Sequence, residues 1–235
     1  MTTSAMLVLL FCLVLTSGTT SFHQDNLNNR PIIGILAQHF HPFNPYPELG
    51  DSYISASYVK FLESAGARVV PIKINQDSKV IMKLLSNVNG VLFPGGDSDV
   101  ANSPYQKNAR AVFEYTMRER NQGRYFPLWG TCLGFQQLAV LAAGTDLVLS
   151  PSSGTWDVSL ALPDLDRGGR MTESIPDDLF QIATVKPLVY HAHYNCVSED
   201  AFEINTKLKD FYRVLSTNVD SNGKRFLSTI EGLFS

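Results

Sequence analysis

The sequence lacks several features that would assign it to a particular class of protein. Its formal net charge is only −3 and its Lys and Arg residues are scattered, so nothing in it predicts nucleic acid or an anionic membrane as a partner. Three cysteines in 235 residues are too few for a disulfide framework. No Asn-x-Ser/Thr acceptor for N-glycosylation is present. The 44% hydrophobic and 17% charged content is that of an ordinary globular domain, so function has to be inferred from local motifs.

The longest apolar run, Ala5–Leu15, is shorter than the roughly 20 residues that cross a bilayer. Small residues follow it at Thr16–Ser21, so we predict a signal peptide over residues 1–21, with no membrane span after its removal. This predicts a protein of the secretory pathway, lysosomal or extracellular. The alternative is a buried apolar helix, but the polar stretch Phe22–Arg30 separates the run from the first predicted strand.

From Pro31 onward the hydrophobic pattern alternates between two periods. It predicts strands over 31–37, 67–74, 90–96 and 125–130, and helices over 52–66, 78–88, 109–120 and 133–143. This alternation favours a parallel sheet covered by helices on both faces, with ligands bound beyond the carboxyl ends of the strands. We further expect edge strands within 147–163 and a hairpin over 213–232 with its turn at Asn222-Gly223. No linker or repeat interrupts the pattern, so one domain is expected over residues 30–235.

Cys132 lies between a predicted strand and a predicted helix in the segment Gly130-Thr131-Cys132-Leu133-Gly134. This is the form of a nucleophile elbow with Cys in place of Ser. The helix N-terminus is expected to lower the pKa of the thiol, and the backbone N–H of Leu133 to stabilise an oxyanion. Gly95 and Gly96, after the neighbouring strand, are candidates for the second oxyanion donor. The alternative is a small buried Cys that only packs at the turn.

Five segments together resemble the γ-glutamyl hydrolases of peptidase family C26, in the class I glutamine amidotransferase-like superfamily. They are "RPIIGIL", "SYISASYVKFLESAGARVVPI", "GVLFPGG", "YFPLWGTCLGFQQL" and "STIEG", and the resemblance extends from about Arg30 to Gly232. It implies a flavodoxin-like α/β fold, a three-layer sandwich with a mostly parallel central sheet. It also implies hydrolysis of folylpoly-γ-glutamates through a thioester on Cys132, no metal or organic cofactor, and a homodimer as the expected association.

The sequence departs from the family pattern at other site positions. The family's general base is a His in a Q-W-H-P-E segment after a strand like "STIEG", whereas this sequence ends at Ser235. We therefore expect the chain to lack that base and to have little activity as given. His193 matches a mid-chain family His and is expected to contact the substrate or assist the reaction, and Gln136, which stands where the family has an acidic residue, is expected to bind the substrate.

Alternatives remain for the histidines and for the function. His191 and His193 are, without the resemblance, a polar pair at a strand end, and no further ligand of suitable spacing makes them a metal site. Three functions are consistent with the motifs. The first is a γ-glutamyl hydrolase, the second a silent relative that binds without cleaving, and the third a glutaminase or peptidase of the same superfamily.

Overall fold

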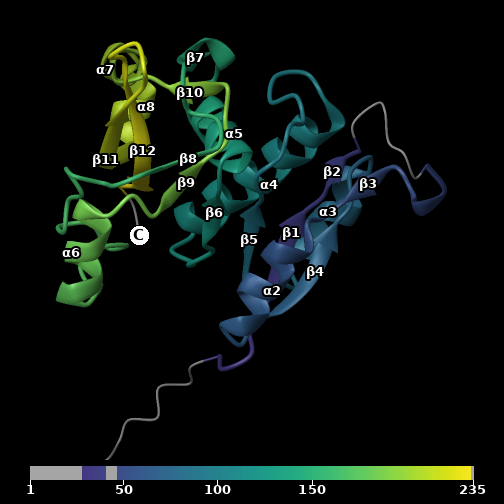
Figure 1. Ribbon diagram of the computed structural model, residues 1–235. Helices are drawn as coiled ribbons and strands as arrows, with labels where there is room; N and C mark the ends of the chain where they lie inside the picture. The colour runs from purple at the N-terminus through teal and green to yellow at the C-terminus, as the bar shows by residue number, and fades with distance from the viewer. Residues whose placement is uncertain (1–27, 41–46, 234–235) are drawn as a thin grey trace, which may run out of the picture.

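The computed structural model describes residues 28–40 and 47–233, and the predicted signal peptide lies outside them. Its centre is a parallel sheet of four strands in the order β4-β1-β5-β6 (Figure 1). The strands are β1 (Ile32–Leu36), β4 (Arg68–Ile72), β5 (Gly90–Phe93) and β6 (Leu128–Gly130). All four overlap the predicted strands. Their order along the sheet is that of flavodoxin-like folds, with the second strand outside the first.

The helices between these strands lie on both faces of the sheet. They are α2 (Ala56–Ser64), α3 (Ser78–Leu85) and α4 (Pro104–Asn121). The chain moves outward from β1 to β4 and then back across to β5. Right-handed crossovers therefore place α2 on one face and α3 on the other. Helix α4 packs against α3, which completes the predicted three-layer sandwich.

Two predicted helix starts were wrong. A short antiparallel pair, β2 (Gln38–His39) with β3 (Ser52–Tyr53), and the 3-10 turn η1 (Pro47–Leu49) precede α2, so residues 52–55 are not helical. Helix α4 begins at Pro104, five residues before the predicted start. The hydroxyl of Ser103 accepts a hydrogen bond from the N–H of Gln106 at 3.0 Å, so a serine cap followed by a proline at the first position begins this helix.

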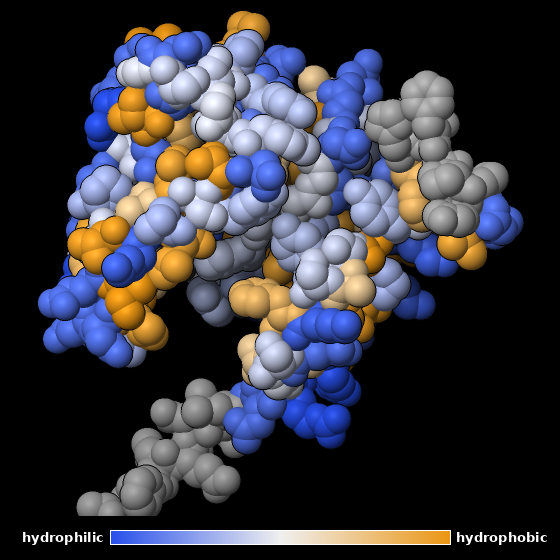
Figure 2. All heavy atoms as spheres, in the orientation of Figure 1, coloured by the Kyte–Doolittle hydropathy of each residue, from blue (hydrophilic) through white to orange (hydrophobic). Residues whose placement is uncertain are grey.

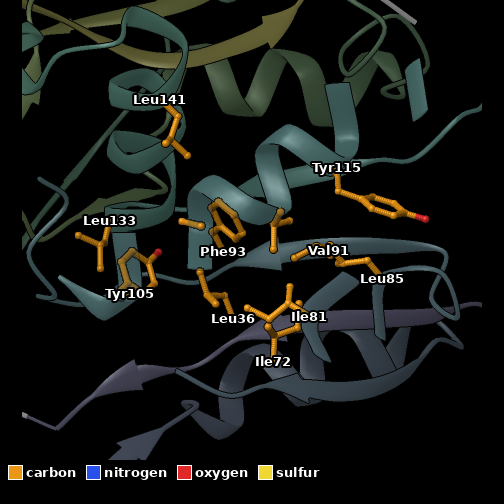
Figure 3. Packing of buried hydrophobic residues seen from close by; sticks show 12 residues of the cluster. Leu36, Ile72, Ile81, Leu85, Val91, Phe93, Tyr105, Tyr115, Leu133 and Leu141 are labelled. Carbon is orange, nitrogen blue, oxygen red and sulfur yellow. The ribbon is translucent and has the colours of Figure 1, made fainter. Parts of the chain in front are cut away.

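Helix α5 (Leu133–Ala143) has the predicted bounds and ends at Gly144 in the left-handed conformation. It contributes to two hydrophobic clusters. The first, shown in Figure 3, fills the space between the parallel sheet and helices α3 and α4 and includes Leu133 and Leu141. The second includes Ala139, Val140 and Ala143 and packs α5 against the C-terminal part of the chain. The helix therefore joins the two halves of the molecule.

The C-terminal half consists of short strands, short helices and one long hairpin. After the 3-10 turn η2 (Asp146–Val148), β7 (Leu149–Pro151) pairs with β10 (Asn195–Val197), and β8 (Val158–Leu160) pairs with β9 (Val189–His191). The strands expected within 147–163 therefore exist, but they pair with distant partners. The helices are α6 (Asp177–Val185), α7 (Glu199–Ile204) and α8 (Thr206–Phe211).

The predicted hairpin is confirmed as β11 (Tyr212–Val219) and β12 (Arg225–Gly232), with Gly223 at φ +81° in its turn. Figure 2 shows the surface hollowed between the hairpin half and the sheet half, with apolar residues bordering the hollow on both sides. Among residues 28–40 and 47–233, no helix combines the length and hydropathy needed to cross a membrane.

Candidate active site

The backbone of Cys132 is strained at the turn between β6 and α5. Its φ of +51° and ψ of −109° lie outside the regions that residues with a side chain normally occupy. Such strain is retained where surrounding structure enforces it, and it clusters at functional sites. The thiol therefore stands at a sharp strand-to-helix turn, which is the geometry expected for a nucleophile elbow.

The glycines beside Cys132 are required by close packing. A Cβ on Gly130 would lie 2.5 Å from the carbonyl oxygen of Gly134, and a Cβ on Gly134 would overlap the carbonyl oxygen of Phe93. The N–H of Thr131 also donates to that Phe93 oxygen at 3.0 Å. The turn is thus pressed against the end of β5, where the second glycine pair lies.

Gly95 and Gly96 lie next to the thiol, but their N–H groups have different partners. The N–H groups of Gly96 and Leu133 both act on the Cys132 sulfur in the direction that favours its charged form. The N–H of Gly95 donates instead to the hydroxyl oxygen of Tyr58 at 2.8 Å. Leu133 and Gly96 therefore stay the candidate pair of oxyanion donors, whereas the Gly95 N–H, also expected to contribute, donates to Tyr58 instead.

The expectation of a lowered pKa for the Cys132 thiol was wrong in its net direction, although the N–H of Leu133 at the helix start does act to lower it. Burial raises the pKa above its ordinary value, and the N–H groups of Leu133 and Gly96 offset only part of that rise. A thiolate is favoured by fixed N–H dipoles but disfavoured by the loss of water around it. The resting site therefore holds mostly the neutral thiol at neutral pH.

Unpaired polar atoms gather around the glycine turn. Gln38 is buried and its amide nitrogen donates to the carbonyl oxygen of Gly95 at 2.6 Å, but its Oε1 has no partner among the described residues. The Tyr105 hydroxyl and Oγ of Ser98 are also buried and have no hydrogen-bond partner among the described residues. Buried polar atoms without partners are costly, and none of these three residues lines the cavity described below. The sequence analysis missed Tyr58, on α2, and Gln38, on β2, and no motif in the sequence marks either residue.

His191 and His193 form a buried pair. Nδ1 of His191 lies 3.1 Å from Nε2 of His193, and the ring of Phe226 packs edge-on against both. Burial lowers the pKa of His191 to about 4 and also lowers that of His193. Both rings therefore lie on the same side of the chain, against Phe226.

One cavity of about 720 Å³ brings these groups together. Cys132, Gln136, His191 and His193 all line it, along with residues of β6 and of the hairpin strand β12. Nε2 of Gln136 donates to the carbonyl oxygen of Asn195 at 2.8 Å, so this predicted substrate-binding residue joins α5 to the histidine segment. The described residues contain no group of three or more His, Cys, Asp or Glu that could hold a metal ion.

Comparisons with known proteins agree with this geometry. Residues 31–153 match the family Peptidase C26. The chain is 43% identical to the γ-glutamyl hydrolase of Bos taurus, over 86% of this chain and 63% of that protein. It is 40% identical to the γ-glutamyl hydrolase of Homo sapiens, over 97% of this chain and 70% of that protein. The chain thus spans roughly two thirds of the length of these curated relatives.

A solved structure supports the fold. The glutaminase domain of Trypanosoma brucei CTPS, determined with bound acivicin, superposes with a TM-score of 0.54 and 13% sequence identity. The superposition covers 86% of this chain and 80% of that one. At this identity the similarity shows a shared fold, that of glutamine amidotransferase domains.

Proposed function

Since the chain belongs to the Peptidase C26 family, together with the γ-glutamyl hydrolases, we propose that it hydrolyses γ-linked amide bonds of folylpoly-γ-glutamates through Cys132. One observation carries the proposal. The strained Cys132 holds its sulfur where the N–H groups of Leu133 and Gly96 converge. That arrangement suits attack on an amide carbonyl, because the negative charge that develops on the carbonyl oxygen is met by donors already in place.

The reaction has two halves. In the first, the sulfur forms a bond to the γ-carbonyl carbon, the C–N bond breaks, and the leaving amine takes a proton. In the second, water attacks the thioester, releases the shortened product with a free γ-carboxylate, and returns the proton to the thiol. Because the thiol is neutral at rest, a base must remove its proton during attack, and the same group can then protonate the amine.

The His191–His193 pair is the candidate for assisting this proton transfer, since both imidazoles line the same cavity as Cys132. Two neutral imidazoles joined by one hydrogen bond present a proton donor at one outer nitrogen and an acceptor at the other. Nε2 of His191 has no hydrogen-bond partner among the described residues and is one of those outer atoms. We propose that His193 contacts the substrate, with Gln136 at the neighbouring wall of the cavity.

The raised pKa of the Cys132 thiol favours a second candidate function. A relative with a neutral thiol can bind γ-glutamyl chains in this cavity without cleaving them.

On either function, we propose that the protein acts in the secretory pathway, in the lysosome or outside the cell, because the apolar run Ala5–Leu15 has the form of a signal peptide. We also propose that the protein forms a homodimer, as its resemblance to the family implies.

The test uses folyl pentaglutamate as substrate. We expect a low yield of shortened folyl products from the wild-type chain and none from Cys132→Ala, because the variant retains the cavity but not the nucleophile. Cys196→Ala is the matched control, since this second thiol is buried on β10, and it is expected to cleave like the wild type. Cleavage that survives Cys132→Ala would remove Cys132 from the mechanism. Binding without cleavage by the wild type would instead support the second function.

A further inference from the structure

Trp156 and Tyr194 form a stacked aromatic pair on the surface of the C-terminal half. Their ring centroids are 4.5 Å apart and their planes differ by only 3°. Trp156 is nevertheless 55% exposed and Tyr194 65% exposed. Each ring covers one face of the other and leaves much of its remaining surface to water. An exposed aromatic pair of this kind favours a ligand that is flat and aromatic, since such a ligand continues the stack.

The backbone holds the two rings in place. The N–H of His193 donates to the carbonyl oxygen of Thr155 at 3.0 Å, and the Thr155 hydroxyl donates to the carbonyl oxygen of His193 at 2.8 Å. The N–H of Ser152 donates to the carbonyl oxygen of Tyr194 at 2.9 Å. The loop carrying Trp156 is therefore fastened to the strand entry carrying Tyr194. A ligand that stacks on the pair does not have to order it first.

The hairpin turn fastens the same loop from the other side. The N–H of Ser153 donates to the carboxylate of Asp220 at 3.0 Å, and the Asn222 amide donates to the Ser153 hydroxyl at 2.9 Å. Beyond Trp156, the carboxylate of Asp157 accepts a hydrogen bond from the Tyr190 hydroxyl at 3.1 Å. Two strand pairs and a hairpin thus converge on the short segment that presents the indole.

Neither ring lines the cavity that contains Cys132, but the chain on both sides of Tyr194 does. Tyr194 lies between His193 and Asn195 in the chain, and both neighbours line that cavity. An extended chain advances about 3.3 Å per residue, so the phenol ring begins within one residue of the cavity wall. Tyr194 itself is directed outward, toward Trp156 and solvent.

We propose that Trp156 and Tyr194 form a subsite for the planar aromatic head of the substrate, the pteroyl group of a folyl-γ-glutamate chain. The inference rests on the proposed function, because it assigns the part of the substrate that lies beyond the γ-glutamyl residues. The head stacks on the outward face of the aromatic pair while the γ-glutamyl chain extends into the cavity toward Cys132. The subsite makes the protein prefer γ-glutamyl chains with an aromatic head over chains without one.

The test measures binding in a Cys132→Ala background, so that cleavage does not interfere. Calorimetric titrations compare two ligands, pteroyl pentaglutamate and penta-γ-glutamate without the pteroyl group. Tyr194→Ala and Trp156→Ala are each expected to weaken binding of the pteroyl ligand by roughly 3- to 10-fold, the usual contribution of a stacked ring pair. Binding of the plain pentaglutamate is expected to stay unchanged. Tyr194→Phe, which keeps the ring, is expected to bind both ligands like the parent.

Phe61→Ala is the matched control, because Phe61 is an aromatic side chain on α2 that is 60% exposed. It is expected to leave both affinities unchanged. Equal losses for the two ligands in Tyr194→Ala, or no loss for either, would overturn the subsite, as would failure of the parent to bind the pteroyl ligand. The proposed function is judged separately, by cleavage in the wild type. If the protein binds the pteroyl ligand more tightly through these rings but cleaves nothing, the subsite is supported and the proposed hydrolase function is contradicted.

Discussion

At Cys132 the geometry and the electrostatics of the site oppose each other. The positive φ and the N–H groups of Leu133 and Gly96 present the sulfur for attack, while burial raises the pKa of the thiol. The thiolate is therefore scarce at neutral pH, and reaction depends on a base that acts when the substrate is bound. Selective alkylation of Cys132 at mildly acid pH, which a lowered pKa would have allowed, is accordingly not expected.

Tyr58 is predicted to position the oxyanion turn. Its hydroxyl accepts the Gly95 N–H, so Tyr58→Phe leaves that N–H without its partner and loosens the Pro94–Gly95 peptide, which adjoins the peptide that carries the Gly96 N–H. We expect kcat for γ-glutamyl hydrolysis to fall roughly 10-fold, a smaller effect than the 100-fold or more seen when an oxyanion donor itself is removed. Steady-state kinetics on folyl pentaglutamate measure this change, and KM should change little.

The control for Tyr58→Phe is Tyr53→Phe. Tyr53 lies on β3, stacks on Phe40, and no hydrogen bond from its hydroxyl to the glycine turn is described. We expect it to retain the wild-type kcat. An unchanged kcat in Tyr58→Phe would show that the turn holds its geometry without the phenol.

His191 is predicted to make stability depend on pH. Its pKa is about 4 in the folded protein and near 6.5 when unfolded, so between these values the unfolded chain binds a proton that the folded chain does not. Stability from this group is complete above about pH 6.5 and is lost as the pH falls toward 4. The loss amounts to at most about 3 kcal/mol, and His193, whose pKa is also lowered, adds to it in the same direction.

His191→Asn removes the titration but keeps a polar group near the position of Nδ1. Urea unfolding at pH 7 and at pH 4.5 is expected to show the wild type losing roughly 2 kcal/mol more than the variant over this interval. Titration of Asp166 and Asp220 does not change the difference in stability loss between the two proteins. The pKa of each carboxyl is lowered from its ordinary value, and both proteins carry both residues. Parallel losses in the two proteins would contradict a buried neutral His191.

At the scale of elements, the sequence was most informative where one residue type forces one conformation. Helix α5 was predicted with correct bounds because glycines at its start and Gly144 after its end permit turns that other residues resist. The hairpin was predicted because Asn222-Gly223 selects a tight turn. The pairing of β7 with β10 could not be predicted, since it joins segments 46 residues apart at Ser150 and Cys196, and local patterns do not encode such partners.

In the candidate site, too, local motifs predicted some residues, whereas contacts between distant parts of the chain could not be predicted. Cys132 and Leu133 follow from a local motif, because a strand, a tight turn and a helix are contiguous in the chain. The bond from Gly95 to Tyr58 joins residues 37 positions apart and depends on how α2 sits beside the sheet. The direction of the thiol pKa was also inaccessible, since it depends on how much water the folded cavity excludes around the sulfur.

At the scale of the whole molecule, α5 contributes buried residues to both hydrophobic clusters of the described residues. One cluster fills the parallel sheet and α3–α4, and the other packs α5 against α8 and the hairpin. The cavity of about 720 Å³ lies between the two halves, lined by β6 on one side and β12 on the other. Because the active-site cavity is bounded by both halves, its shape depends on how firmly α5 holds them together.

This arrangement predicts that the hairpin half opens before the sheet half. Ala139 is fully buried in the second cluster, so Ala139→Leu inserts volume between α5 and its neighbours there and costs about 1–3 kcal/mol. Hydrogen exchange is expected to quicken in β11 and β12 while β1 and β5 keep their protection. Ala109→Leu is the matched control, since Ala109 is equally buried on α4 in the first cluster, and it should lower protection in the sheet strands. If Ala139→Leu lowers protection in both halves to the same extent, the two clusters unfold as one unit, and the cavity between them is a fixed feature of a single cooperative core.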